Sequence, residues 1–396
     1  MRGAPPWERW LDCRFPAQAE VWRSALIDRG RDPSDYVAIP VHPWQAQNVI
    51  PKRFSRSIAK GDLVLLPEPA IPCAPLVSVR TLVPGEPVDA PHLKLSIAVR
   101  MTSVERTISP RTCEMGPRVS KLLQDLIESD AVLSSVLRIL PEEAGMYFAS
   151  ADSAELDDAR HLAALLRSNP SRLCASDEIV IPTTALTADS PMTGTPLFLE
   201  LSQIEAGVGL AAIQTCFAQY ADALLRPLLT LYLRYGIALE AHQQNTLVLY
   251  SRDGALRHFL FRDFGGIRIH EPSLRRAGLD LEIHPDRLTV VAERQAVRRQ
   301  LTAHALHRHV GFLVSRICRH LQTSEQPFWS DVADVVQTIL DELQGDVAAA
   351  TWRQERAALL DDDWNFKANL RMRLENPSHD VYVQSTNPFR WAGQSS

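Results

Sequence analysis

The chain has 396 residues, 45% of them apolar, with a formal net charge of −5 and a pI near 6.2. This length allows two or three domains with ordinary cores, and the acidic balance argues against a general nucleic-acid binder, which needs a basic footprint. No apolar run approaches the ~18 residues of a membrane span and no apolar signal core follows the start, so we expect a cytoplasmic protein. The six cysteines lack a Cys-x-x-Cys pair, which predicts reduced thiols and neither a disulfide framework nor a zinc site.

The first 35 residues carry tryptophans at helical spacing, interrupted by Pro16 and ended near Gly30. A strand is predicted over 36–41. The pre-proline restriction then keeps His42 out of the helical region, and Pro43 is a favoured first helical position, so a short helix should cover 43–49. His42 is either a substrate contact or a histidine held by the packing of this turn.

Two strands with alternating polar residues come next. After a short apolar strand over 63–66, residues 76–83 and 92–101 alternate and should pair antiparallel across the Pro/Gly loop between them. This pairing would place Arg80 opposite Lys94. Like charges directly opposite each other destabilise a sheet unless an anion lies between them, so the pair predicts a bound phosphate.

The segment after the second strand adds further groups suited to phosphate oxygens. Thr102 offers a hydroxyl and Arg106 a guanidinium, while Ser78 shares a face with Arg80. The alternative is a solvated basic face on which Arg106 pairs with Glu105 or another carboxylate. Taken together, the cations and hydroxyls favour an anion site.

The middle of the chain is predicted to be scaffold. Amphipathic helices are expected over 120–140 and 154–168, and the stretch 183–196, with Thr, Ser, Pro and Gly, should be a loop at a domain boundary or a mobile flap. A long helix over 209–235 is apolar nearly all round and should be buried. Gly236 ends it.

A β-hairpin follows this helix. Residues 246–250 and 256–261 are rich in β-branched and aromatic side chains, and Asp253-Gly254 is a strong turn signal between them. Because a hairpin folds back on itself, its ends bring together an amide, two carboxylates and an imidazole, which suits a magnesium ion bridging nucleotide phosphates. These side chains belong to Glu240, His242, Asn245 and Asp263. The alternative is a solvated loop with no ligand.

The remaining chain should be mostly helical, with helices over 293–321, 331–344, 347–361 and one near 367. His304, His307 and His309 lack acidic partners at ligand spacing, so we do not expect them to form a metal site. The three aspartates at 361–363 are predicted to end a helix. The basic segment 367–374 either adds positive charge to the cleft or caps the domain.

Six of these stretches, in order between residues 36 and 375, resemble the IucA/IucC family of siderophore synthetases, which work independently of nonribosomal peptide synthetases. The matching motifs are His42-Pro-Trp-Gln45, Ser78-Val-Arg-Thr81, Lys94-Leu-Ser-Ile97 running into Thr102-Ser-Val-Glu-Arg-Thr107, Glu240-Ala-His-Gln-Gln-Asn245, Arg262-Asp-Phe-Gly-Gly266 and Lys367-Ala-Asn-Leu-Arg-Met-Arg-Leu374. The resemblance implies an α+β protein. An antiparallel, β-rich fingers domain (36–195) would precede a largely helical palm (196–396), which carries the hairpin and a FhuF-like C-terminal region.

The resemblance also implies an enzyme that uses ATP and Mg²⁺ to convert a carboxylate, such as citrate, into an acyl-adenylate and then joins it to an amine or hydroxyl. Small-molecule carboxylates and amines would be its partners, without nucleic acid or membrane, and a homodimer is compatible with it. Magnesium ligands would be Glu240, Asn245 and Asp263, and nucleotide contacts would be Ser78, Arg80, Thr81, Lys94, Thr102, Arg106, His242, Asn245 and Asp263. His242, Arg106 and Lys94 would act at the reacting centre.

One departure from the family pattern concerns the N-terminus. Family members carry a substantial region, the thumb, before the matching portion, so residues 1–35 resemble a remnant of the thumb. Catalytic turnover by this chain is therefore not assumed. Two alternatives therefore stand beside the synthetase. A kinase-like phosphotransferase would also use His-x-x-Asn and Asp-Phe-Gly, although the chain has no Gly-x-Gly-x-x-Gly loop near its start. A nucleotide-binding remnant without turnover is the other.

Overall fold

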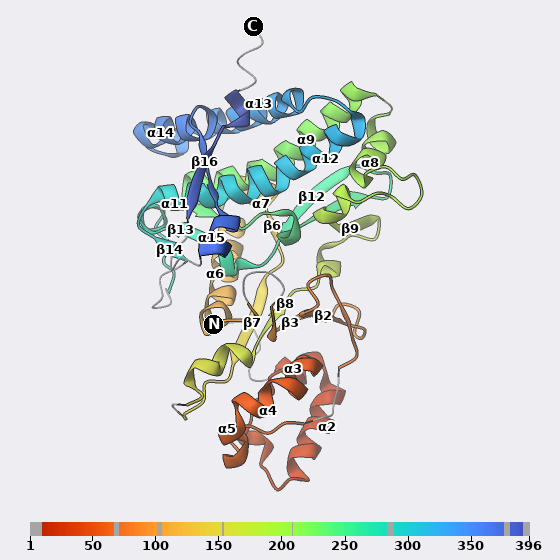
Figure 1. The fold of residues 1–396 in the computed structure, drawn as a ribbon, viewed down its shortest axis with the longest axis vertical. Helices are drawn as coiled ribbons and strands as arrows, with labels where there is room; N and C mark the ends of the chain where they lie inside the picture. The colour runs from red at the N-terminus through yellow and green to blue at the C-terminus, as the bar shows by residue number, and fades with distance from the viewer. Residues whose placement is uncertain are drawn as a thin grey trace. The chain divides into compact units, whose positions relative to one another are not determined.

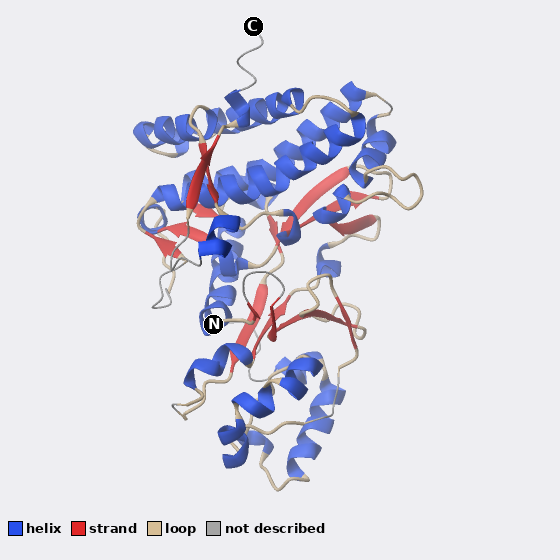
Figure 2. Ribbon diagram, viewed as in Figure 1, coloured by secondary structure: helices blue, strands red, loops and turns tan. Residues whose placement is uncertain are grey.

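The computed structural model describes residues 10–66, 71–100, 105–152, 154–207, 209–282, 289–375 and 381–390. The chain divides into two compact units, drawn in Figure 1. Unit 1 comprises Met1–Lys121 and Leu140–Leu173, and unit 2 comprises Leu122–Ile139 and Cys174–Ser396. Each unit combines helices with mainly antiparallel strands, so the predicted α+β class is confirmed (Figure 2). None of the described helices has the length and apolar character needed to cross a bilayer.

The described part of unit 1 is built on an antiparallel sheet with the strand order β1-β2-β3-β8-β7. Its strands are β1 (Cys73–Pro75), β2 (Thr81–Pro84), β3 (His92–Leu95), β8 (Ala163–Arg167) and β7 (Glu142–Tyr147). A separate antiparallel ribbon joins β4 (Ile97–Arg100) to β5 (Glu105–Arg106). The central strands β3 and β8 are buried along their whole length, so they form the middle of the core.

Helices cover this sheet, and two of them begin at Pro16 and Pro43. The helices of unit 1 are α1 (Trp10–Arg14), α2 (Pro16–Ile27), α3 (Pro43–Asn48), α4 (Ile50–Arg53), α5 (Ser55–Lys60) and the first part of α6 (Pro110–Ser129). The break at Pro16 and the start at Pro43 are confirmed. Trp10 and Phe15 pack with Leu93 and Leu95 in one hydrophobic cluster, so residues 10–27 belong to the core of unit 1.

The predicted strand over 76–83 is wrong in its first half. Residues 76–80 form the turn between β1 and β2, closed by a bond from the Val79 N–H to the Leu76 carbonyl, and Val79 has a left-handed φ of 49°. The apolar alternation that suggested a strand is misleading, because the side chain of Val77 is exposed. The antiparallel pairing with the next strand is confirmed, but its register differs by one residue: Thr81, not Arg80, lies opposite Lys94.

Three other predictions for unit 1 are also wrong. Residues 36–41 and 63–66 run without strand pairing. The predicted helix over 154–168 is a 3-10 turn (Leu156–His161) followed by β8. Alanine and leucine favour a helix locally, but the burial of β8 between β3 and β7 outweighs this propensity.

Unit 2 contains, in its described residues, two mixed sheets and a short ribbon. The first sheet has the order β6-β12-β11-β9, the second β10-β13-β14, and the ribbon pairs β15 with β16. Their bounds are β6 (Arg138–Ile139), β9 (Glu178–Pro182), β10 (Ile237–Ala238), β11 (Thr246–Ser251), β12 (Leu256–Phe261), β13 (Arg268–His270), β14 (Val290–Val291), β15 (Trp364–Lys367) and β16 (Tyr382–Ser385). The predicted hairpin is therefore confirmed as β11 and β12.

Helices make up most of unit 2, and α13 packs along α9 (Figure 1). They are α7 (Ala131–Val136), α8 (Leu197–Ala206), α9 (Leu210–Thr230), α10 (Glu271–Arg276), α11 (Arg294–Leu301), α12 (Phe312–Leu321), α13 (Gln326–Glu342), α14 (Ala349–Leu360) and α15 (Asn369–Glu375). Two segments, Leu231–Tyr235 and Thr302–Gly311, are π-helical. The long predicted helices are confirmed, whereas the helix expected over 120–140 breaks at Ser129 and gives way to α7 and β6.

Gly236 ends the long buried helix in a left-handed conformation, with a φ of 68°. A β-carbon there would lie 2.7 Å from the Ser273 Cβ and 2.8 Å from the His270 Cβ, so both the backbone angle and the packing require glycine. The chain then enters β10 and the loop that carries Glu240 and His242.

Candidate functional site

The hairpin brings its two ends together as the sequence predicted. Thr246 pairs with Phe261, and the Arg262 N–H donates to the Asn245 carbonyl at 3.0 Å. Asp263 follows with a left-handed φ of 69°, an uncommon conformation for a residue with a side chain. Such backbone conformations concentrate at functional sites, so this observation supports a site at the end of the hairpin.

Glu240 lies at the centre of a compact group of potential ligands. Its Oε1 is 3.7 Å from the His242 Nε2 and 3.9 Å from the His304 Nε2, and the two imidazole rings are 5.4 Å apart. One ligand atom from each of the three residues lies within 4.8 Å of the other two. Gly266 makes room for the carboxylate, since a β-carbon at this position would clash with Glu240 Oε2.

Buried hydrogen bonds fix the loop that carries these groups. His309 is fully buried, and its two ring nitrogens contact the Ala241 carbonyl at 3.0 Å and the Tyr220 hydroxyl at 2.6 Å. Thr246 donates its hydroxyl to the His242 carbonyl at 3.1 Å, and the Asn245 N–H donates to the same carbonyl at 2.9 Å. Glu240 and His242 are therefore held by a rigid frame.

Burial favours the neutral forms of His242 and His309. Burial lowers the pKa of His242, with Arg308 and Arg262 also lowering it and Asp263 opposing them. Burial also lowers the pKa of His309 to about 4. Both imidazoles thus carry a lone pair near neutral pH, the form that accepts hydrogen bonds and binds metal ions.

His304 is the residue of this group that the sequence interpretation missed. No acidic partner stands at ligand spacing from His304 in the sequence, yet in the fold it faces Glu240, which is distant in sequence. The three histidines have separate surroundings: the His307 ring packs on Phe366 with centroids 3.4 Å apart, and His309 belongs to the buried frame. The π-helical segment Thr302–Gly311 carries all three, and π-helical turns often occur at functional sites.

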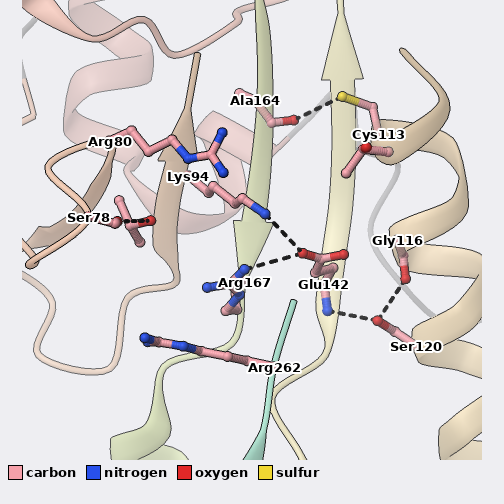
Figure 3. A network of polar contacts seen from close by, with 12 residues as sticks. Ser78, Arg80, Lys94, Cys113, Gly116, Ser120, Glu142, Ala164, Arg167 and Arg262 are labelled. Carbon is pink, nitrogen blue, oxygen red and sulfur yellow. Dashed lines mark hydrogen bonds and ion pairs between the residues drawn. The ribbon is translucent and has the colours of Figure 1, made fainter. Parts of the chain in front are cut away.

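In unit 1, Lys94 lies in a buried ionic cluster, as Figure 3 shows. Glu142 Oε1 is 4.0 Å from the Lys94 Nζ and 3.3 Å from an Arg167 Nη2, and each of the three side chains is at most 4% exposed. Gly116 leaves space for Glu142, and the Ser120 hydroxyl accepts from the Glu142 N–H at 2.8 Å. A carboxylate of the chain itself thus lies beside Lys94, and the cross-strand pair of Arg80 and Lys94 from which a bound phosphate was inferred does not form.

The remaining predicted phosphate contacts of unit 1 lie around the β1–β2 turn and β5. Arg80 donates to the carbonyls of Arg106 and Thr107 at 3.2 and 3.1 Å, and the Ser78 hydroxyl donates to the Thr81 hydroxyl at 3.0 Å. Figure 3 shows Ser78 and Arg80 near the strand that bears Lys94. Thr102 lies outside the described residues.

The His42-Pro-Trp-Gln45 motif has a structural role in unit 1. The His42 ring accepts a hydrogen bond from the Trp44 N–H at 3.1 Å and so caps α3. Gln45 is fully buried; its amide donates to the His161 carbonyl and accepts from the Ala98 N–H, at 2.9 and 2.8 Å. This motif joins α3 to β4 and to the segment before β8, which agrees with the interpretation of His42 as a turn residue.

Comparison with known proteins identifies the family. The model of the IucA / IucC family matches residues 5–188, and that of the ferric iron reductase FhuF-like transporter matches residues 215–381. This chain belongs to the IucA/IucC family. Among curated relatives, the D-ornithine--citrate ligase of Staphylococcus aureus is 27% identical over 375 residues, which cover 90% of this chain and 57% of that protein.

Solved structures share the fold of this family member. The petrobactin biosynthesis protein AsbB of Bacillus anthracis superposes with a TM-score of 0.86 at 21% identity, covering 98% of this chain and 65% of that one. The ATP-bound aerobactin synthetase IucA of Klebsiella pneumoniae superposes with a TM-score of 0.69 at 22% identity, covering 89% of this chain and 61% of the other. The chain spans about three fifths of the length of the curated relatives it matches first.

Proposed function

We propose that this IucA/IucC family member is an ATP-dependent ligase that activates a carboxylate, of the citrate class, and joins it to an amine or hydroxyl. The observation that carries the proposal is the rim at the end of the β11–β12 hairpin, where Glu240, His242, Asn245 and Asp263 lie on one frame. The relatives support it, since they include a protein named as a citrate ligase and a synthetase solved with ATP.

The chemistry of the rim suits a magnesium ion carried by a nucleotide. Glu240 is accessible, with 28% of its side chain exposed, and its carboxylate rests against Gly266. Carboxylate and amide oxygens are the ligands that Mg²⁺ prefers. Glu240, Asn245 and Asp263 would hold the ion, whose charge offsets that of the phosphates, while neutral His242 would contact the phosphate or carboxylate at the reacting centre.

The proposed nucleotide contacts of unit 1 are cations and hydroxyls. Ser78, Arg80, Thr81, Thr102 and Arg106 would contact phosphate oxygens. Lys94 is only 3% exposed and shares Glu142 with Arg167. We propose that Arg106 makes the direct contact at the reacting centre and that Lys94 acts there through its positive charge.

The reaction would proceed in two displacements. A carboxylate oxygen of the substrate attacks the α-phosphorus of ATP, the bond between the α-phosphorus and the bridging oxygen breaks, and pyrophosphate leaves. The amine or hydroxyl then attacks the acyl carbon, AMP leaves, and the nucleophile loses its proton. Positioning two anions side by side is the main difficulty, and the cations and Mg²⁺ relieve their repulsion.

Product analysis tests the proposal. The purified chain is incubated with ATP, Mg²⁺, citrate and hydroxylamine, and the products are separated by ion-exchange chromatography and mass spectrometry. AMP, pyrophosphate and a citryl hydroxamate in equal amounts are expected. ADP as the product would establish the kinase-like alternative, whereas ATP binding without any turnover would establish a nucleotide-binding protein. A panel of other carboxylates and amines then defines the substrates, and light scattering tests whether the chain forms a homodimer.

A further inference from the structure

We propose that Glu240, His242 and His304 form a binding site for a divalent transition-metal ion of the Zn²⁺ or Co²⁺ class. This site is distinct in ligand chemistry from the proposed magnesium site. It shares one residue, Glu240, with that site. Its formation requires no nucleotide, so it stands or fails independently of the proposed ligase activity.

The spacing of the three side chains fits such an ion. In a tetrahedral site with metal–ligand distances of about 2.0–2.2 Å, neighbouring ligand atoms lie about 3.3–3.6 Å apart. The distances from Glu240 Oε1 to the two imidazole nitrogens are 3.7 and 3.9 Å, and the whole set lies within 4.8 Å. Small side-chain rotations therefore bring all three atoms into coordination distance, and three protein ligands leave a fourth position for water or a substrate oxygen.

The kinds of ligand determine which ion binds. Imidazole nitrogens suit Zn²⁺, Co²⁺ and Ni²⁺, whereas Mg²⁺ strongly prefers oxygen ligands. Two imidazoles and one carboxylate form a set found in zinc enzymes with an open coordination position. The cluster of Glu240, His242 and His304 therefore discriminates against Mg²⁺. The oxygen ligands proposed for the magnesium ion of the nucleotide do not.

The surroundings hold the three ligands in place before any ion binds. The carbonyl of His242 accepts hydrogen bonds from the Thr246 hydroxyl and the Asn245 N–H, and Glu240 rests against Gly266. His304 comes from the π-helical segment and is 4% exposed, so its ring has little freedom to turn away. Ligands fixed in this way lose little conformational entropy on binding.

A consequence for activity rests on the proposed function. Because Glu240 belongs to both sets of ligands, a transition-metal ion bound at His242 and His304 would withdraw this carboxylate from magnesium. Micromolar Zn²⁺ should then inhibit the ligase in the presence of millimolar Mg²⁺.

Spectroscopic titration of the nucleotide-free full chain tests the site. After treatment with a chelator, the chain is titrated with Co²⁺ and its visible d–d absorption is recorded, and Zn²⁺ is then added to displace the cobalt. We expect one equivalent of cobalt to bind, with the intense bands of a four- or five-coordinate ion. His304→Gln should weaken binding by about 100-fold or more, at least as much as the loss of an outer-shell partner.

Two variants guard against misinterpretation. His307→Gln alters a histidine of the same π-helical segment whose ring packs on Phe366, and it should leave cobalt binding unchanged. His242→Gln is a second ligand variant in case His304→Gln misfolds, which circular dichroism would reveal. Equal cobalt binding by the parent chain and both ligand variants would overturn the proposal, as would no saturable binding at all. Metal binding without ATP turnover would support the transition-metal site and contradict the proposed ligase activity. ATP turnover without metal binding would contradict only the transition-metal site.

Discussion

Two carboxylates, Glu142 in unit 1 and Glu240 in unit 2, have similar partners but opposite accessibility. Each carboxylate rests against a glycine, at a distance where a β-carbon on that glycine would clash with it. Each also has two side chains with basic nitrogen atoms nearby. The Glu142 side chain has no exposed area, and its partners Lys94 and Arg167 are sealed with it. Glu240 is 28% exposed and faces two imidazoles. A sealed carboxylate can only hold cations of the chain, whereas an accessible one can exchange ligands, so we assign structure to the first and chemistry to the second.

Removing the sealed carboxylate should give the largest effect. Glu142→Gln removes the carboxylate that lies beside the buried cations Lys94 and Arg167, so we expect a loss of about 3–5 kcal/mol in the free energy of unfolding. Urea denaturation followed by circular dichroism measures this change. Glu143→Gln is the matched control: its carboxylate bonds the more exposed Arg14 and Arg172 and should cost about 1 kcal/mol or less. Equal losses in the two variants would contradict the structural role of Glu142.

The accessible carboxylate should behave in the opposite way. Glu240→Gln should reduce AMP formation about 100-fold or more, because it removes a proposed metal ligand, and change the unfolding free energy by less than about 1 kcal/mol. Coupled pyrophosphate detection and urea denaturation of the same sample measure both quantities. Asp253→Asn, at the turn end of the same hairpin, should retain parental activity. A Glu240→Gln chain that is strongly destabilised would remove the contrast with Glu142.

Gln45 sharpens the comparison because it is a second motif residue with a structural role. Gln45→Met keeps the volume of the side chain but leaves the Ala98 N–H and the His161 carbonyl without their partner, so we expect a loss of about 1–3 kcal/mol. Gln47→Met, at an exposed position of the same helix, should change the stability by less than about 0.5 kcal/mol. Thermal denaturation compares the two variants. A stable Gln45→Met chain with impaired activity would instead place this motif in the reaction.

The buried frame behind Glu240 should give a pH-dependent stability. Burial lowers the pKa of His309 from 6.5 to about 4, so between these values the unfolded chain binds more protons than the folded chain. The contribution of His309 to the free energy of unfolding is therefore fully present above pH 6.5. It decreases as the pH falls toward 4, by at most about 1.4 kcal/mol per pH unit. Urea denaturation at pH 7, 6 and 5 measures the slope. His309→Gln should reduce it, and an unchanged slope would assign the effect to other groups.

The sequence was informative where structure depends on neighbouring residues. Asp253-Gly254 and its flanking β-branched residues sufficed to predict the hairpin, and Gly236 sufficed to predict the end of the long helix. Hairpin geometry then brought Asn245 beside Arg262 without further information. Site residues at the open end of the hairpin could be proposed for the same reason.

Pairings between distant segments could not be predicted from the sequence. Nothing local in the Ala163–Arg167 segment shows that it lies between β3 and β7, and its alanines and leucines favour a helix. Strand register depends on the connection between the paired strands, and Thr81, not Arg80, is the partner of Lys94. Glu142 and His304 reach their partners only through the tertiary fold, so neither the buried ionic cluster nor the three-ligand group was visible in the sequence.

Isotope exchange between pyrophosphate and ATP tests the central claim of carboxylate activation most directly, because it requires no acceptor amine. The chain is incubated with ATP, Mg²⁺, citrate and labelled pyrophosphate, and the label appearing in ATP is measured. Citrate-dependent exchange that is lost in Glu240→Gln is the expected result. Bound ATP that never exchanges with pyrophosphate, with any carboxylate offered, would contradict the account.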